Sequence, residues 1–143
     1  MRIQDVLRSK GDAVHMIAPD ATVSALLAEL ASHNVGALVV SADGATVAGI
    51  VSERDVVRRL HEQGTSVLDG PVSAIMTSDV TTCRGTDPVE DLMRLMTEHR
   101  IRHLPVLGDD GTLVGVISIG DVVKTRMSEL EHERTNLIDY IAG

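Results

Sequence analysis

Two segments of the sequence combine a glycine, a hydroxyl and a carboxylate in an order that suits nucleotide binding. Residues 49–55 read Gly-Ile-Val-Ser-Glu-Arg-Asp, and residues 115–121 repeat the pattern as Gly-Val-Ile-Ser-Ile-Gly-Asp. Each segment is typical of a strand that runs into a helix, where free backbone N–H groups and the helix dipole favour a phosphate. The carboxylate one turn further, Asp55 or Asp121, can accept hydrogen bonds from both hydroxyls of a ribose. The glycine would let a ligand approach the strand backbone closely.

The same pattern also has a purely structural interpretation. Ser52 and Asp55, like Ser118 and Asp121, have the spacing of a capping box, in which two side chains satisfy backbone N–H groups at a helix start. Such a cap stabilises a helix by about 1 kcal/mol without any ligand. A duplicated fold duplicates its caps as well, so repetition alone does not distinguish a nucleotide site from two ordinary caps.

Both segments belong to a tandem duplication. A shift of 66 residues aligns residues 14–58 with residues 80–124 without a gap, and Asp5-Val6-Leu7 echoes Ala74-Ile75-Met76 upstream. A cluster of glycine and proline marks the junction between the copies. We therefore expect four parts, which are a first repeat (1–62), a linker (63–71), a second repeat (72–126) and a C-terminal helical extension (127–143).

Each repeat predicts the same order of elements, β-α-β-β-α, and hence an α/β (α+β) fold. Short strands are expected at 14–17 and 80–83, each followed by a turn and by a helix with apolar residues at helical spacing. Asp87 is expected to cap the second of these helices, with Pro88 at its first position. Two further strands joined by an Asp-Gly turn, and then a closing helix, complete each repeat.

Composition excludes several classes of protein. The chain has 13 Lys and Arg against 21 Asp and Glu, and this net charge of −8 argues against a nucleic-acid binder. Tyr140 is the only aromatic residue, so a flat ligand must be held by aliphatic side chains or arginine planes. No apolar run approaches the roughly 20 residues that span a bilayer. With Cys83 as the only cysteine, we expect a soluble cytoplasmic protein.

The duplicated Gly-apolar-apolar-Ser-x-x-Asp pattern completes a resemblance to a known family. Together with the segments Pro19–Val23 and Arg102–Val106 and the two lead-in segments upstream, it resembles a CBS-domain pair, or Bateman module, over roughly residues 1–124. The chain is most similar to small bacterial proteins that carry a CBS pair without an attached enzyme. The resemblance implies a pseudo-twofold module that binds adenosyl ligands (AMP, ADP, ATP, S-adenosylmethionine or NAD(H)) in clefts between the repeats.

The resemblance also implies which residues bind the ligand. Ser52 and Asp55 would hold phosphate and ribose in one cleft, and Ser118 and Asp121 in the other. The adenine would lie against the first strand, and against the start of the second strand, of the same repeat. The residues implied in this way are Met16, Ile17, Ala18, Gly36 and Ala37 in the first repeat, and Thr82, Cys83, Arg84, Arg102, His103, Leu104 and Pro105 in the second.

We expect the two sites to differ in their affinity for phosphate. Arg54 stands beside the cap in the first repeat, whereas Gly120 takes this place in the second. The second site would therefore need Arg102, Arg84 or a residue of the first repeat to meet a phosphate. The first site is expected to be the better one for a charged phosphate.

Three other features carry weaker hypotheses. His99 and His103 have the spacing of helical metal ligands, but the repeat places them on different elements, and we favour no metal. Cys83 could be a redox thiol, although a lone strand cysteine is more often a small buried hydrophobe. Apolar residues from Val123 to Ile141 continue the last helix, and they could fasten a homodimer or pack on their own module.

The sequence thus predicts a non-catalytic regulatory module that requires no cofactor, binds an adenine nucleotide and passes its state to an unknown protein partner. The alternative is a constitutive interaction or redox-linked adaptor whose clefts are empty caps. An enzyme is disfavoured because neither segment supplies a general base.

Overall fold

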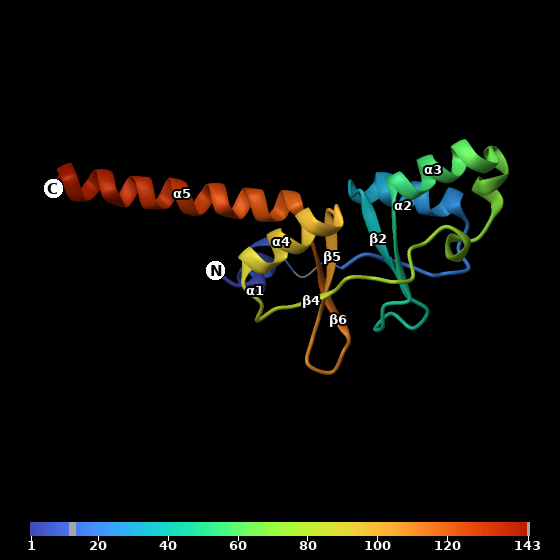
Figure 1. The fold of residues 1–143 in the computed structure, drawn as a ribbon, viewed down its shortest axis with the longest axis horizontal. Helices are drawn as coiled ribbons and strands as arrows, with labels where there is room; N and C mark the ends of the chain where they lie inside the picture. Colours follow the sequence, from blue (N-terminus) through green and yellow to red (C-terminus); the bar gives the residue numbers. More distant parts are fainter. Residues whose placement is uncertain (12–13, 143) are drawn as a thin grey trace.

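A computed structural model describes residues 1–11 and 14–142 of the chain, and it contains two similar halves (Figure 1). Each half has a three-stranded sheet in which the first strand runs parallel to the second and the second antiparallel to the third. The first half contains β1 (Met16–Ile17), α2 (Val23–His33), β2 (Ala37–Val40), β3 (Gly49–Ser52) and α3 (Glu53–Gln63). The second contains β4 (Cys83–Arg84), α4 (Val89–His99), β5 (His103–Leu107), β6 (Leu113–Ser118) and α5 (Ile119–Ala142). The predicted α/β class and the order β-α-β-β-α are confirmed.

The start of α4 differs from the prediction. Pro88, with an extended backbone, is the N-cap of this helix, and the helix begins at Val89. Asp87 does not cap it, because its Oδ2 accepts a hydrogen bond of 2.9 Å from the backbone N–H of Arg84, closing the preceding turn. By contrast, Thr22 caps α2 through its Oγ1, which accepts from the N–H of Ala25 at 3.1 Å.

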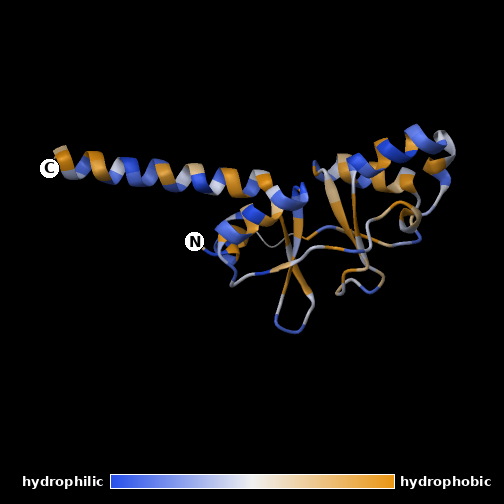
Figure 2. Cartoon of the chain, viewed as in Figure 1, coloured by the Kyte–Doolittle hydropathy of each residue, from blue (hydrophilic) through white to orange (hydrophobic). Residues whose placement is uncertain are grey.

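The segments that lead into the two repeats pack on the opposite halves. Helix α1 (Ile3–Lys10) places Ile3 and Val6, both fully buried, in the core of the second half. The short helices η1 (Thr65–Asp69) and η2 (Val72–Ala74) belong to the core of the first half. Backbone hydrogen bonds tie these segments to the opposite repeats, such as Ile3 N–H to the Asp87 carbonyl at 3.0 Å. Each core is therefore completed by a segment of the opposite repeat. Figure 2 shows apolar residues along the strands of both halves.

The exchange of lead-in segments between the halves explains why two strand positions are glycines. We had expected these glycines to make room for a ligand. A Cβ on Gly49 would lie 2.7 Å from the Sδ of Met76 and 2.8 Å from the carbonyl oxygen of Thr77. A Cβ on Gly115 would lie 2.9 Å from a terminal carbon of Leu7. Both glycines therefore face the lead-in segment that crosses from the other repeat, and the ligand role expected of them was wrong.

Candidate functional site

Two cavities lie between the halves, and each contains one of the Ser-x-x-Asp motifs. The first cavity, of about 550 Å³, is lined by Ser52 and Asp55 together with Thr77, residues 79–81 and residues 99–103 of the second half. The second, of about 400 Å³, is lined by Ser118 and Asp121 together with residues 14–15 and 33–38 of the first half. Each motif thus faces segments of the opposite repeat. The cavities lie between the repeats, as the resemblance implies, but the adenine was expected against strands of the same repeat as the motif.

In the first cavity the Ser-x-x-Asp motif forms a complete capping box. Asp55 Oδ2 accepts hydrogen bonds from the backbone N–H of Ser52 at 2.8 Å and from the Ser52 hydroxyl at 3.1 Å. The Ser52 Oγ in turn accepts from the N–H of Asp55 at 3.4 Å. Among the described residues, every hydrogen bond to this carboxylate ends on Oδ2, so Oδ1 is the oxygen that a ligand hydroxyl can use.

The helix start in this cavity offers fewer free amides than the sequence led us to expect. The N–H of Glu53 donates to the Gly36 carbonyl at 3.0 Å, and the N–H of Asp55 is used by Ser52. In the second cavity the N–H of Ile119 donates to the Arg102 carbonyl at 2.9 Å in the same way. These amides are therefore already paired within the protein, and an anion in either cavity would depend mainly on charged side chains.

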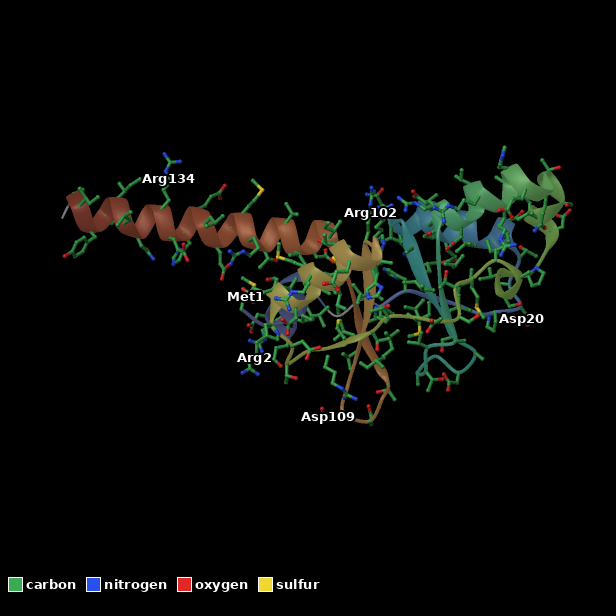
Figure 3. All side chains as sticks on the ribbon, in the orientation of Figure 1. Met1, Arg2, Asp20, Arg102, Asp109 and Arg134 are labelled. Atoms are coloured by element: carbon green, nitrogen blue, oxygen red, sulfur yellow. The ribbon has the colours of Figure 1, made fainter. Side chains whose placement is uncertain are left out.

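Arginine side chains supply this charge in the first cavity. Arg54 and Arg58 stand one turn apart on α3, and Arg100 and Arg102 lie on the facing segment between α4 and β5. Figure 3 shows Arg102 at the junction of the two halves, where α4 gives way to β5. Guanidinium groups on both walls suit phosphate oxygens, which they bind in a bidentate manner.

The second cavity has a different set of charges. Lys10, from the end of α1, reaches into it and donates from Nζ to Asp121 Oδ2 at 2.8 Å and to the Val116 carbonyl at 2.7 Å. Asp121 Oδ2 also accepts from the N–H of Ser118 at 2.9 Å. The rings of His15 and His33 stack with their centroids 3.6 Å apart. Among the described residues, the positive charge on this wall comes from a lysine, whereas four arginines line the first cavity.

Lys10 also sets the ionisation of its neighbours. Partial burial by itself raises the pKa of the Asp121 carboxyl, but hydrogen bonds from Lys10 and from Ser118 outweigh it, and the pKa lies below its ordinary value. Burial, and then the charge of Lys10, lower the pKa of His103. The surroundings of the His103 imidazole, which lines both cavities, therefore favour its neutral form.

The structure brings about half of the residues implied by the resemblance to the cavities. Those on a cavity wall are Gly36, Ala37, Ser52, Arg54, Asp55, Arg102, His103, Ser118 and Asp121. Those on neither cavity wall are Met16, Ile17, Ala18, Thr82, Cys83, Arg84, Leu104 and Pro105.

The residues outside the cavities have other surroundings. Ile17, Cys83 and Leu104 are buried in the two hydrophobic cores. Burial raises the pKa of the Cys83 thiol to about 12, which removes the thiolate that redox chemistry needs. Arg84 donates to the Gly108 carbonyl at 2.9 Å, near the β5–β6 hairpin whose tip carries Asp109 (Figure 3), so it does not serve the second cavity.

Sequence reasoning missed Lys10, His15 and His33. A signal for Lys10 was present, because the echo between Asp5-Val6-Leu7 and Ala74-Ile75-Met76, continued for three residues, places Lys10 opposite Asp79. Asp79 lies on the wall of the first cavity, as Lys10 lies in the second. The stacked histidines carried no such signal, because residues 18 positions apart meet only after α2 has folded back beside β1.

His99 and His103 lie at the end of α4 and at the start of β5, as expected from the repeat. Within the described ranges, no three His, Cys, Asp or Glu side chains converge as metal ligands would. In the same part of the chain, no helix combines the length and the apolar character needed to cross a membrane.

Comparison with known families decides how this architecture is classified. A family model for the CBS domain matches the chain twice, over residues 4–62 and 72–128. The chain belongs to the CBS-domain family. A mitochondrial CBS domain-containing protein of Arabidopsis thaliana is 40% identical over 149 residues, which cover 99% of this chain and 72% of the plant protein. A CBS domain-containing protein of Bacillus subtilis is 33% identical over 117 residues and 80% of each chain.

Solved CBS-domain structures agree with the fold. A CBS-domain protein of Agrobacterium tumefaciens has a TM-score of 0.84 at 42% identity, covering 88% of this chain and 99% of its own. A CBS-domain protein of Pyrobaculum aerophilum, solved in complex with AMP, has a TM-score of 0.73 at 35% identity, covering 85% and 89%. CBS pairs also occur within enzymes. Inosine-5'-monophosphate dehydrogenase of Methanocaldococcus jannaschii is 27% identical over 110 residues, which are 77% of this chain but 21% of the enzyme.

Proposed function

We propose that this CBS pair is a non-catalytic regulatory module that binds an adenine nucleotide in the first cavity. The observation that carries the proposal is the meeting of the Asp55 carboxylate with four arginines in one cavity between the repeats. Asp55 Oδ1 suits the ribose hydroxyls, and the guanidinium groups of Arg54, Arg58, Arg100 and Arg102 suit the phosphates. The AMP complex of the Pyrobaculum relative supports this class of ligand.

The position of the cavity suggests how binding would become a signal. Its walls come from α3 in the first half and from the segment between α4 and β5 in the second. A ligand that contacts both walls binds one relative arrangement of the halves more tightly, and it shifts the population toward that arrangement. A partner protein that recognises this arrangement would receive the signal.

The proposal is tested by calorimetric titration of the full chain with AMP, ADP, ATP, NADH and S-adenosylmethionine. We expect saturable binding of at least one of these ligands at sub-millimolar concentration. No heat of binding with any of them would overturn the proposal. A mass measurement of small molecules that co-purify with the protein would identify the natural ligand.

The alternative function is a constitutive adaptor whose cavities stay empty. Its redox-linked form is disfavoured by Cys83, which is 4% exposed and whose thiol lies 3.6 Å from the Pro105 carbonyl. Substitution of Asp55 and Asp121 by Ala separates the two functions. A sensor would lose ligand binding, whereas an adaptor would keep its partner and lose only the stability of two helix caps.

We further propose that the module forms a homodimer through α5. This helix extends well beyond the body of the molecule (Figure 1), and its outer apolar side chains are at least half exposed. The exposed fractions are 58% for Met127, 54% for Leu130, 60% for Leu137 and 75% for Ile141. These residues share one face of the helix, and a second copy could cover it.

The double variant Leu130→Glu/Leu137→Glu is expected to convert a dimer into a monomer, because it places two buried charges in each helix of the interface. Sedimentation velocity measures the change. The control Ser128→Glu/Thr135→Glu adds the same charge on the opposite face of α5 and should leave the dimer intact. A wild-type chain that is monomeric at 100 µM, or a dimer that tolerates the Leu130/Leu137 variant, would contradict the proposal.

The cytoplasm is the proposed location, on the ground of the single cysteine, although the Arabidopsis relative is mitochondrial. No enzymatic activity is proposed for this chain. The dehydrogenase relatives match it over about a fifth of their length, so the likeness concerns their CBS pair.

A further inference from the structure

The second cavity contains a feature that the first lacks, an internal cation bound to its Ser-x-x-Asp carboxylate. Lys10 Nζ lies 2.8 Å from Asp121 Oδ2, and the two residues are 111 positions apart in the chain. Among residues 1–11 and 14–142, no lysine or arginine forms an ion pair with Asp55, the matching carboxylate of the first cavity. The two cavities therefore differ at the residue on which ribose binding would depend.

Lys10 also donates a hydrogen bond to a backbone carbonyl. It donates to the carbonyl of Val116 at 2.7 Å, and the equivalent carbonyl in the first half, that of Ile50, accepts from the N–H of Thr77 at 2.9 Å. In the first half, backbone pairing alone satisfies this acceptor, and the carboxylate stays available. In the second half, one ammonium group donates to this acceptor and to Oδ2 of the carboxylate, whose charge it neutralises.

The fold holds the amine of Lys10 in this place. Lys10 is the last residue of α1, and this helix packs on β6 and α5 through Ile3 and Val6, which are completely buried. The side chains of Lys10 and Asp121 are 35% and 22% exposed, so their ion pair is partly shielded from solvent. Such a pair is stronger than a fully exposed one, and a neutral ribose hydroxyl is a weaker donor than an ammonium group.

We infer that Lys10 closes the second cavity to nucleotides, so that each chain binds one nucleotide, in the first cavity. Asp121 Oδ1 accepts no hydrogen bond among the described residues, but a ribose that reached it would have to share the carboxylate with the ammonium group, which neutralises its charge and lies in the same cavity. The inference rests on the proposed function. It adds the number of nucleotides that each chain binds, and it names Lys10 as the residue that limits this number to one. Removal of the amine should improve binding to the second cavity by at least about tenfold.

The test is calorimetric titration of the full chain with AMP as the probe. The variant Lys10→Met keeps the length of the side chain and removes its charge, and Lys10→Gln provides a second, polar variant in case the first is unstable. Arg8→Met is the matched control, because it removes a cation from the same helix. The Arg8 side chain is 79% exposed, and among the described residues its ion pair is with Asp5, at 3.8 Å. Thermal unfolding of every variant checks that it is folded.

We expect one AMP per chain for the wild type and for Arg8→Met, and two for both Lys10 variants. The added site should disappear in the double variant Lys10→Met/Asp121→Asn. Two sites in the wild type, or one site in both Lys10 variants, would overturn the inference and leave the proposed function standing. Weaker binding in the Lys10 variants would overturn it too, since Lys10 would then hold the nucleotide. No AMP binding in any variant would overturn the inference, and the proposed function would fall with it only if ADP, ATP, NADH and S-adenosylmethionine also failed to bind.

Discussion

The substitution Asp55→Asn is expected to weaken AMP binding to the first cavity by about 100-fold, or about 2.7 kcal/mol. The carboxylate can accept charge-assisted hydrogen bonds from both ribose hydroxyls, whereas the amide keeps one acceptor oxygen and presents a donor instead. The change is conservative in volume, so the helix start at Ser52 should be largely preserved. Calorimetric titration with AMP measures the change in dissociation constant.

A matched control for this variant is Asp91→Asn. Asp91 occupies the corresponding place in the first turn of α4, where it is exposed and lies on neither cavity. The Asp91→Asn variant removes the same charge as Asp55→Asn, but away from the cavities. We therefore expect it to bind AMP as the wild type does, unless the overall loss of charge is what weakens binding. Unchanged affinity in Asp55→Asn would show that Asp55 serves only as a helix cap, which is the structural interpretation of the motif.

The substitution Gly49→Ala is expected to lower the free energy of unfolding by about 2–3 kcal/mol. The new methyl group would meet a backbone atom, the carbonyl oxygen of Thr77 at 2.8 Å, as well as the side chain of Met76 at 2.7 Å. It could be accommodated only by moving the Thr77 segment, which exchanges backbone hydrogen bonds of 3.0 and 2.9 Å with Ile50. Urea unfolding followed by circular dichroism measures the loss.

Gly115→Ala is the matched comparison, because Gly115 holds the equivalent place in the second half. The atoms near its added methyl group belong to the side chain of Leu7, which can change its rotamer. We expect a smaller loss here, of about 1 kcal/mol. Equal losses at the two positions would contradict the view that the backbone of residue 77 sets the cost at Gly49.

The element order of both halves could be predicted from the sequence because it depends on local patterns. The apolar spacing of Val23, Leu26 and Leu30 in α2 marks a buried helix face, and all three are at most 4% exposed. The turns at Gly44 and Gly111 adopt positive φ angles, which their Asp-Gly sequences favour. Pro88 shows the limit of such rules. It was expected at the first helical position, but it is the N-cap, because Asp87 bonds the backbone of Arg84 instead of capping the helix.

The candidate site was harder to predict because it lies between the repeats. Ser52 and Asp55 were found from their spacing, and the structure places both on the first cavity. The adenine contacts were assigned to the same repeat as the motif, because the resemblance implied it. In the structure, residues 99–103 of the second half provide the wall instead, and the adjacent strand residue Ile17 is 7% exposed in the core.

The sequence by itself determined that the chain is a duplication, that each copy folds as β-α-β-β-α, and that two carboxylates stand at equivalent helix starts. These properties follow from local spacing and from the identity of aligned residues. The tertiary structure alone decided that the lead-in segments exchange between the halves, since this depends on which core has room for Ile3 and Val6. The same exchange brings Lys10 onto Asp121, whereas Asp55 forms no ion pair with any residue that the structure describes, so two nearly identical motifs acquire different surroundings.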